Sequence, residues 1–288
     1  MQTYTNEQLK RLREIELKMA EHFVSFCNEH HLMCYFCGGG CIGAIRHKGF
    51  IPWDDDLDFF MPRKSYEKLQ SLWLKYANHQ YAICKPSRTY HDHNQFITIR
   101  DRNTTMIKPY QSDLDIVHGV NLDIFPLDGY PDSKVKRYIQ MLWSCIYSLF
   151  CTEQIPQKHG YGLKLVSYIG LNLFRSKNIR YRIWHFAEKQ MSKYPIKDCS
   201  YITELCAGPK YMKKRYPKKI FSSAVFMDFE NTKMPLPIGY DQYLKIAFGN
   251  YMELPPLKER IPQHDVSMID LEHSYTIYRG IYFCTKNT

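Results

Sequence analysis

The sequence has no hydrophobic run long enough to cross a membrane. Its most apolar stretches, residues 141–150 and 163–174, fall short of the roughly 18–20 residues that a spanning helix needs, and they contain Ser, Lys or Asn. Residues 1–18 are polar and charged, so they lack the apolar core of a secretory signal peptide. We therefore expect a cytoplasmic protein, with peripheral association at the inner face of a membrane as an open alternative.

The sequence also has no internal repeat and no low-complexity segment. Hydrophobic residues make up 44% of the 288 residues and charged residues 24%, which are ordinary globular values and exclude a disordered chain, a collagen-like repeat and a coiled coil. Acidic residues are the scarcer charged class, because 29 Asp and Glu stand against 39 Lys and Arg, a formal net charge of +10. Such a chain favours anionic partners: nucleic acid, phosphorylated small molecules or an acidic membrane face.

The ten cysteines do not form a complete metal-binding pattern. Without a signal peptide we expect reduced thiols rather than disulfides. The nearest approach to a zinc motif is the C-x2-C-x3-C spacing of Cys34, Cys37 and Cys41, which follows His30 and His31. A zinc knuckle normally needs a second ligand pair, and none follows nearby. We favour the alternative, in which these cysteines are small hydrophobic residues of a buried strand.

The order of apolar and polar residues predicts an α/β (α+β) fold. Thr5 is expected to cap a first helix whose apolar residues recur every three or four positions. In the first 130 residues we predict helices over 6–30, 41–47 and 65–77 and strands over 33–37, 56–61, 81–84, 95–100 and 120–125, the last ended by Pro126. The second half is predicted to be largely helical, over 133–151, 162–174 and 179–193. Alternating strands and helices predict a mixed β-sheet core formed by residues 1–132, with residues 133–288 packed on it as one compact unit.

Four aspartates within the five residues 54–58 mark the most informative segment. Residues two apart on a strand point the same way, so Asp54, Asp56 and Asp58 are predicted to share one face while Leu57 anchors the other. Neighbouring carboxylates repel one another unless a cation lies between them, and oxygen ligands suit a hard divalent cation such as Mg²⁺. The alternative is a solvated acidic loop, although the apolar residues around the cluster argue against a loop tip.

A run of glycines precedes this cluster. Gly39 and Gly40 lie directly before a predicted helix, where glycine lets backbone N–H groups approach an anion and the helix dipole favours negative charge. Most glycine runs are plain turns, but Arg46, His47 and Lys48 follow here and can meet phosphate charge. The glycine turn, the basic residues and the carboxylates together indicate a site for a phosphorylated ligand and a metal.

A further carboxylate, Asp123, interrupts the apolar segment 121–125. A carboxylate among apolar neighbours is costly unless it is paired or binds a ligand. If its strand lies beside residues 56–61, Asp123 completes a site of three aspartates. The alternative is a structural Asp that accepts hydrogen bonds from backbone N–H groups.

Three blocks of this sequence resemble the LicD family. The first and most specific is Gly39–Pro62, with its Gly-Gly pair and the run Arg-His-Lys-Gly-Phe-Ile-Pro-Trp-Asp-Asp-Asp-Leu-Asp. The second is Asp123–Gly129, and the third covers residues 248–256 together with Arg260. The matches are spread over nearly the whole chain.

The resemblance implies a nucleotidyltransferase-like fold whose catalytic core is residues 1–132. It also implies transfer of a phospho-alcohol, above all phosphocholine, from a CDP-activated donor such as CDP-choline to a cell-surface glycan precursor. The related fukutin-type proteins share this core and transfer ribitol phosphate. Carried over by position, Asp56 and Asp58 match the metal-binding pair and Asp123 the third carboxylate, with Mg²⁺ or Mn²⁺ as cofactor. Two positions depart from the family pattern: Gly40 stands where Ser or Thr is common, and His264 is followed by Asp where a His-His pair is often found.

We expect these aspartates to hold one or two metal ions that bridge the donor diphosphate while an acceptor hydroxyl attacks in line. Asp123 is the expected proton acceptor, and His264 is the second candidate. Positive side chains are expected to stabilise the phosphate oxygens, since positioning and electrostatics supply most of the rate in phosphoryl transfer. The residues predicted to contact substrate are Gly39, Gly40, Arg46, Lys48, Asp54 and Arg63.

Three alternatives stay open. The same carboxylates suit a nucleotidyltransferase that moves NMP to an acceptor, and the transferred alcohol can be glycerol or ribitol. A nucleic-acid-binding protein would explain the net charge, but no RNA-binding motif accompanies the basic residues, so we expect no nucleic-acid partner. The basic stretch Lys210–Lys219 is either a solvated loop or a contact with an anionic membrane that presents a lipid-linked glycan acceptor.

Overall fold

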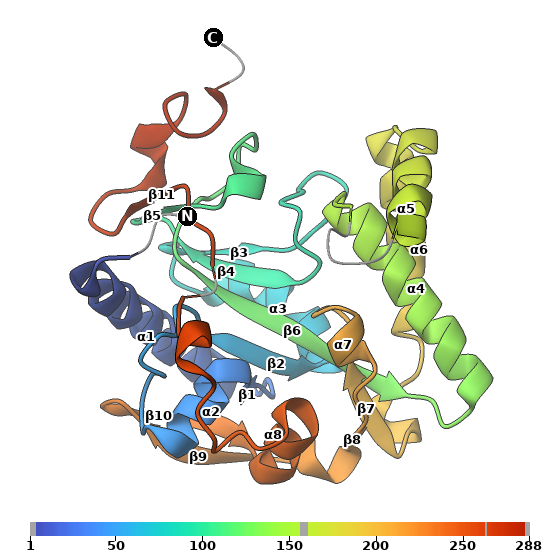
Figure 1. Cartoon of the computed structure of the whole chain (residues 1–288), viewed down its shortest axis with the longest axis horizontal. Helices are drawn as coiled ribbons and strands as arrows, with labels where there is room; N and C mark the ends of the chain where they lie inside the picture. Colours follow the sequence, from blue (N-terminus) through green and yellow to red (C-terminus); the bar gives the residue numbers. More distant parts are fainter. Residues whose placement is uncertain (1–3, 156–160, 263, 286–288) are drawn as a thin grey trace. The chain divides into compact units, whose positions relative to one another are not determined.

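The computed structural model describes residues 4–155, 161–262 and 264–285 and has a mixed α/β architecture (Figure 1). The helices are α1 (Asn6–Glu29), α2 (Gly38–Arg46), α3 (Arg63–Tyr76), α4 (Lys134–Thr152), α5 (Tyr161–Leu173), α6 (Lys177–Met191), α7 (Pro209–Met212) and α8 (Tyr240–Phe248). The strands are β1 (Tyr35–Phe36), β2 (Asp58–Pro62), β3 (Tyr81–Cys84), β4 (Ile97–Asp101), β5 (Thr105–Ile107), β6 (Asn121–Tyr130), β7 (Tyr201–Glu204), β8 (Tyr216–Pro217), β9 (Ala224–Phe229), β10 (Thr232–Pro237) and β11 (Met268–Asp270). The predicted α+β class with a mixed sheet is confirmed.

The chain divides into two compact units, each formed by segments that are separate in the sequence. The first unit combines residues 1–84, 98–125 and 219–288, and the second combines residues 85–97 and 126–218. The C-terminal segment therefore returns to the unit that contains the N-terminus. All residues of the predicted site lie in the first unit.

The first unit is built on strands in the order β1-β2-β6-β4-β3. Strand β1 pairs with β2 in antiparallel register, with Tyr35 opposite Phe60. Helix α1 buries its apolar stripe against this sheet and against α3, because the ring of Phe23 lies 4.9 Å from that of Phe59 and the ring of Phe26 lies 4.6 Å from that of Trp73. The predicted cap is confirmed: Thr5 and Gln8 form a reciprocal capping box at the start of α1.

Three predicted element boundaries shift in the structure. Strand β2 begins at Asp58 rather than Asp56, so the preceding aspartates lie in irregular backbone and the strand alternation inferred for them is wrong. Helix α2 begins at Gly38, which places the glycines in its first turn rather than before it. Strand β6 continues through Pro126, because this proline lies just before the residues that pair with β7, starting at Leu127.

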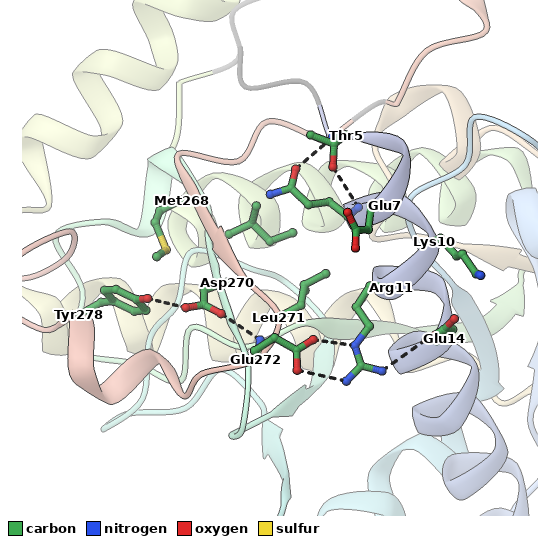
Figure 2. Close-up of a pocket in the computed structure, with 12 residues that line it drawn as sticks. Thr5, Glu7, Lys10, Arg11, Glu14, Met268, Asp270, Leu271, Glu272 and Tyr278 are labelled. Carbon is green, nitrogen blue, oxygen red and sulfur yellow. Dashed lines mark hydrogen bonds and ion pairs between the residues drawn. The ribbon is translucent and has the colours of Figure 1, made fainter.

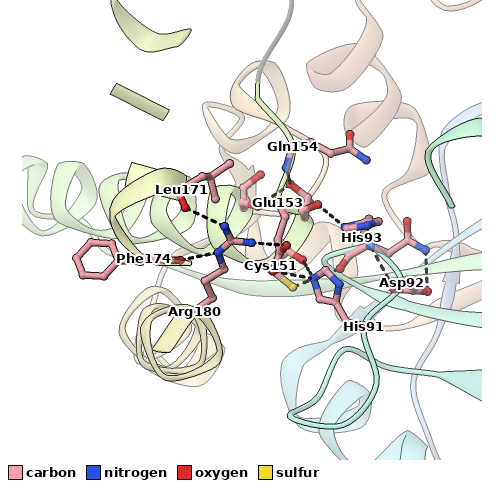
Figure 3. A network of polar contacts seen from close by, with 12 residues as sticks. His91, Asp92, His93, Cys151, Glu153, Gln154, Leu171, Phe174 and Arg180 are labelled. Carbon is pink, nitrogen blue, oxygen red and sulfur yellow. Dashed lines mark hydrogen bonds and ion pairs between the residues drawn. The ribbon is translucent and has the colours of Figure 1, made fainter. Parts of the chain in front are cut away.

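The second unit contains the second half of β6, strands β7 and β8, and helices α4–α7. Helices α4 and α6 lie side by side (Figure 1). Polar residues bind the C-terminal ends of α4 and α5 (Figure 3): His91 Nε2 lies 2.5 Å from the carbonyl oxygen of Cys151, and Arg180 donates to the carbonyls of Leu171 and Phe174. Arg180 also pairs with the carboxylate of Glu153 at 2.5 Å. These contacts satisfy carbonyls that have no partner within their own helices and so hold both helix ends.

The predicted burial of the first three cysteines is confirmed, but their predicted place in a strand is wrong, because β1 contains only Tyr35 and Phe36 and Cys41 lies in α2. Cys34, Cys37 and Cys41 are free and buried. None of them belongs to a cluster of potential metal ligands within the described part of the chain. Along the same described ranges, no helix combines the length and the hydropathy needed to span a membrane.

Candidate active site

The aspartate loop, residues 54–57, lies against the N-terminal end of α2 and the start of β2. Its backbone is held by Arg13 of α1, whose guanidinium donates to the carbonyl oxygens of Asp54 and Ile51 at 2.9 and 3.0 Å. The backbone N–H of Gly38 donates to the hydroxyl of Tyr243 in α8 at 3.1 Å. Arg13 therefore holds the loop backbone to α1, and the bond from Gly38 joins the start of α2 to α8 beside it.

The glycines of α2 allow two carboxylates to approach the helix closely. A Cβ atom on Gly39 would lie 2.2 Å from Asp54 Oδ2, and one on Gly38, whose φ is +57°, would lie 3.3 Å from Asp58 Oδ2. The positive φ at Gly38 is a conformation that favours glycine. Both carboxylates therefore lie where the exposed N–H groups and the dipole of a helix N-terminus favour negative charge.

Crowding shifts the ionisation of these carboxyls. Burial raises the pKa of Asp54 to about 8, and the carboxylates of Asp56 and Asp55 add to the rise. Burial also raises the pKa of Asp58 well above its ordinary range, with Asp56 and Asp123 as further causes. The charged forms repel one another in a region with limited access to water, so a bound cation would stabilise them.

Two of these oxygens are left without a hydrogen bond. Asp54 Oδ2 and Asp58 Oδ1 are buried and have no partner in the described structure. Buried polar atoms are rarely left in this state unless they serve another purpose. Carboxylate oxygens are the ligands that Mg²⁺ and Mn²⁺ prefer, so the residues present fit the predicted cation.

His264 of the C-terminal segment joins the aspartate loop. Its Nδ1 lies 3.1 Å from Asp55 Oδ1, its backbone N–H donates to Asp55 Oδ2, and its Nε2 lies 3.6 Å from Asp56 Oδ2. Burial opposes a positive charge on the imidazole, but the hydrogen bond to Asp55 and the charge of Asp56 outweigh it and raise the pKa of His264. Asp55, Asp56 and His264 form the one described cluster in which three potential metal ligands all lie within 4.8 Å of one another.

Asp123 approaches the same cluster from β6, the strand next to β2. Its Oδ1 accepts a hydrogen bond from Asn121 Nδ2 at 2.5 Å, and its charge contributes to the raised pKa of both Asp56 and Asp58. Buried Lys108 supplies an opposing charge: burial lowers its pKa, but Tyr110 and Asp123 more than offset this, and the net shift is upward. The structure thus brings together the three aspartates predicted from separate parts of the sequence.

Comparison with known protein families identifies the family of this chain. The sequence pattern described as LicD/FKTN/FKRP, nucleotidyltransferase domain, matches residues 31–178, about half of the chain. The chain belongs to the LicD family. The matched LicD region contains α2, the aspartate loop and Asp123, whereas His264 lies beyond it.

Two relatives extend the LicD comparison. The lipopolysaccharide cholinephosphotransferase LicD of Haemophilus influenzae is 27% identical over 270 residues, which cover 89% of this chain and 96% of that protein. An uncharacterized protein of Rickettsia typhi is 24% identical over 145 residues, which cover 47% of this chain and 44% of that protein. Membership in the LicD family confirms the predicted resemblance and makes this chain a member of a family of transferases.

The departure from the LicD pattern at Gly40 has a structural cause. A Cβ atom on Gly40 would lie 2.2 Å from Cζ of Phe36, and all three nearest atoms belong to that ring. Phe36 therefore occupies the space that a Ser or Thr side chain would need. At this position the backbone is the only group that can meet a ligand.

The predicted basic contacts differ in their positions. Arg46 ends α2 and donates to the carbonyl oxygens of Tyr251 and Glu253 at 2.7 and 3.2 Å, so it joins the first LicD block to the third. Lys48 is exposed in the turn after α2, and Arg63 begins α3 with its guanidinium 5.3 Å from the ring centre of Tyr66. The structure thus gives Arg46 a scaffolding role in addition to the predicted substrate contact.

Sequence reasoning missed Asp55, Lys108 and Glu16 as parts of this site. Asp55 is not among the aspartates that strand alternation places on one face, yet it is buried and faces His264. Glu16 lies in the apolar stripe of α1, where burial and then the loop aspartates raise its pKa well above the ordinary range. A buried acid in an otherwise apolar helix stripe is a signal that could have identified Glu16, whereas no local pattern distinguishes Lys108.

A separate groove of about 590 Å³ lies between the N-terminal part of α1 and the segment around β11 (Figure 2). Arg11 crosses it to pair with Glu272 at 2.8 Å, and Tyr278 donates to Asp270 at 2.5 Å. None of the predicted site residues lines this groove. The exposed ion pair between Arg11 and Glu272 links the C-terminal segment to α1, although an exposed pair contributes little to stability.

Proposed function

We propose that this chain transfers phosphocholine from a CDP-activated donor, in a metal-dependent reaction, to a hydroxyl of a cell-surface glycan precursor. The observation that carries the proposal is the cluster of Asp54, Asp56, Asp58 and Asp123 around the N-terminus of α2, with two buried oxygens that have no hydrogen bond. The named activity of the Haemophilus influenzae relative supports the choice of phosphocholine and of a glycan acceptor such as lipopolysaccharide.

Asp56, Asp58 and Asp123 would hold the divalent cation, as the resemblance implies. When bound, Mg²⁺ or Mn²⁺ would neutralise charge on the donor diphosphate and on the departing CMP. Asp56 is shared with the tighter group formed by Asp55 and His264. We therefore assign Asp56 the central position in the proposed site.

The groups around these carboxylates suit an anionic donor. The N-terminus of α2 offers backbone N–H groups and the positive end of the helix dipole, and the absence of a side chain on Gly39 leaves room beside them for the carboxylate of Asp54. Lys108 carries a buried positive charge beside Asp123. These fixed charges would position the phosphates, as positioning and electrostatics dominate phosphoryl transfer.

The acceptor hydroxyl needs a group that takes its proton. Asp123 is oriented by Asn121, and His264 is oriented by Asp55, which holds Nδ1 and leaves Nε2 directed toward Asp56. Both satisfy the geometric requirement that a base be fixed by a second group. We propose Asp123 as the general base that takes this proton and His264 as the second candidate.

A donor panel tests the proposal. The protein is incubated with Mg²⁺, a glycan acceptor and each of CDP-choline, CDP-glycerol and CDP-ribitol, and CMP release and the mass of the product are measured. A product heavier by phosphocholine, formed only with CDP-choline and only with metal, is expected. A glycan that gains glycerol or ribitol phosphate would correct the alcohol, and an acceptor that gains a nucleotide would replace the proposal with nucleotidyl transfer.

A further inference from the structure

The N-terminal half of helix α4 presents polar side chains to the protein and apolar side chains outward, whereas its C-terminal half buries Tyr147, Phe150 and Cys151. On the inner side, Gln140 Nε2 donates to the carbonyl oxygens of Gly129 and Met191 at 2.9 and 2.8 Å, and Ser144 Oγ donates to that of Leu205 at 2.6 Å. Arg137, also buried, donates to Gln140 Oε1 at 2.6 Å. This arrangement is the reverse of an ordinary surface helix, whose apolar stripe faces the core.

The outward face is a continuous apolar stripe. Its members Val135, Tyr138, Ile139 and Leu142 recur at spacings of three and four residues, and we call them the α4 stripe. They are 68%, 72%, 42% and 58% exposed. Contiguous exposed apolar patches on a folded chain mark interaction sites.

Helix α5 adds a second exposed apolar set next to the C-terminal end of α4. A Cβ atom on Gly170 of α5 would lie 3.8 Å from the side chains of Leu149 and Phe150 in α4, so the two helices are neighbours there. The large apolar side chains of α5 that are exposed are Leu165, Val166, Tyr168, Ile169 and Leu173. Figure 3 shows that Arg180 and the His91–His93 segment hold the ends of both helices, so their orientation is fixed.

The charges around these apolar residues have one sign. Residues 134–152 and 161–177 contain no Asp or Glu, whereas Lys134, Lys136, Lys164, Arg175 and Lys177 lie among them. Paired across a two-fold axis, such a face would bring like charges together, which disfavours a second copy of the chain as its partner. A partner with an apolar interior and an anionic surface satisfies both features.

A basic groove adjoins the N-terminal end of the α4 stripe. Its volume is about 440 Å³, and its polar lining includes Lys134, Arg137, Lys213 and Arg215, with Asp132 as the opposing charge. Aromatic rings hold the arginines in place: Arg137 lies 4.3 Å from the ring centre of Tyr130, and Arg215 lies 3.5 Å from that of Tyr201. Tyr138 belongs both to the groove and to the stripe. Arg137 is buried and donates to Gln140 and Thr203, so it forms the floor of the groove. The exposed groups that suit a phosphate are Arg215, Lys134 and Lys213.

We propose that the α4 stripe and its basic groove dock the protein on an anionic phospholipid bilayer, with the apolar side chains in the interfacial layer and a lipid phosphate in the groove. Amphipathic helices with basic flanks bind membranes in this manner without crossing them. The inference goes beyond the proposed transfer and is independent of it, because docking is measured without turnover. It assigns the membrane contact to α4 rather than to the Lys210–Lys219 stretch as a whole.

Vesicle co-sedimentation of the full chain tests the proposal. Vesicles are made of phosphatidylcholine alone or of an equal mixture of phosphatidylcholine and phosphatidylglycerol. We expect binding to the mixed vesicles, weakened as salt screens the charges, and little binding to the neutral ones. Leu142→Glu should weaken binding about tenfold or more, because it removes apolar area that the bilayer would bury and adds a negative charge. Lys134→Glu should weaken it at least about fivefold.

Leu74→Glu is the matched control, because Leu74 is a leucine on α3 of the other unit that is at least as exposed as Leu142, 69% against 58%. It should bind vesicles as the wild type does. A second readout avoids dependence on a charged variant: a fluorophore on exposed Cys145 of α4 should be quenched by nitroxide-labelled lipids in the mixed vesicles. The proposal would be overturned if the wild type does not bind anionic vesicles at low salt. It would also be overturned if Leu142→Glu binds as tightly as the wild type. A wild-type dimer that Leu142→Glu converts to a monomer would overturn it as well, since the stripe would then be a subunit interface.

Discussion

His118 is a buried histidine whose surroundings do not tolerate a positive charge. Its ring lies 4.4 Å from that of Phe283, and its Nε2 lies 2.9 Å from the carbonyl oxygen of Leu114. Burial lowers the pKa of His118 to about 4. The unfolded chain binds the proton near pH 6.5, so between these two values the unfolded state holds more protons than the folded state.

We therefore predict that the free energy of unfolding falls by about 2 kcal/mol between pH 7 and pH 5 through His118 alone. Urea unfolding of wild type and of His118→Phe at both pH values measures the difference. The variant should lose this part of the pH dependence, whatever its stability at pH 7. An identical drop in both proteins would show that other groups dominate the acid response.

Asp58 combines a raised pKa with a proposed role in binding metal. At pH 7 its charged form is disfavoured by burial and by Asp56, and this lowers the stability of the metal-free protein. We predict that Asp58→Asn raises the free energy of unfolding by about 1 kcal/mol in the absence of metal and lowers transfer at least about a hundredfold. Calorimetry in chelator and CMP release measure the two effects. A variant that remains active, or that is destabilised like an ordinary core substitution, would remove Asp58 from the proposed site.

At the scale of elements, the first turn of α2 determines where the aspartate loop can lie. We predict that Gly39→Ala lowers kcat/KM at least about tenfold while the fold stays intact, because the new Cβ atom, 2.2 Å from Asp54 Oδ2, forces this carboxyl to shift. Gly170→Ala in α5 is the matched control: it adds only ordinary contacts and should stabilise the helix by roughly 0.5–1 kcal/mol without changing activity. Equal activity of Gly39→Ala and wild type would mean that Asp54 has no part in the site.

In helix α4 we expect a polar substitution to cost more stability than an apolar one. Gln140→Ala removes the donor to two carbonyl oxygens and leaves Arg137 with Thr203 in place of two partners, so it should cost about 2–3 kcal/mol. Leu142→Ala removes an exposed side chain and should change stability by less than about 0.5 kcal/mol. Denaturant unfolding of the two variants gives the comparison. If Leu142→Ala proves the costlier change, the stripe is covered in solution and the inverted arrangement of α4 is wrong.

At the scale of the whole molecule, the chain has a positive net charge, whereas the side chains around the aspartate loop are mostly acidic. The chain carries +10 overall, yet the loop and its neighbours gather Asp54, Asp55, Asp56, Asp58, Asp123 and Glu16. We predict that millimolar Mg²⁺ raises the melting temperature of the wild type by several degrees, because a ligand that binds only the folded state stabilises it by mass action. Differential scanning fluorimetry with Mg²⁺, with EDTA and with added monovalent salt as control measures this. An equal effect on Asp58→Asn would show that the cation acts elsewhere.

The return of the C-terminal segment also belongs to this scale. His264, Tyr243 and the carbonyls that bind Arg46 all come from residues 219–288, which lie in the first unit. We expected residues 133–288 to pack on the core, but the individual contacts could not be predicted from the sequence, because they join residues about two hundred positions apart. Hydrophobic patterning describes neighbours in the sequence, and it carries no information on such pairings.

Local patterns in the sequence were sufficient to predict the family, the α+β class, the cap at Thr5 and most helices. Capping, periodicity and the aspartate motif depend on residues that are close in the sequence. The sequence brought Asp123 to Asp58 only on the condition that their strands are neighbours, and β2 and β6 are neighbours in the sheet. Only the tertiary structure decided that Phe36 fills the space beside Gly40, that Asp55 faces His264, and that α4 exposes its apolar side. The physical reason is the same in each case. What a side chain meets is set by elements distant in the sequence, and its charge, burial and orientation depend on those partners rather than on its own segment.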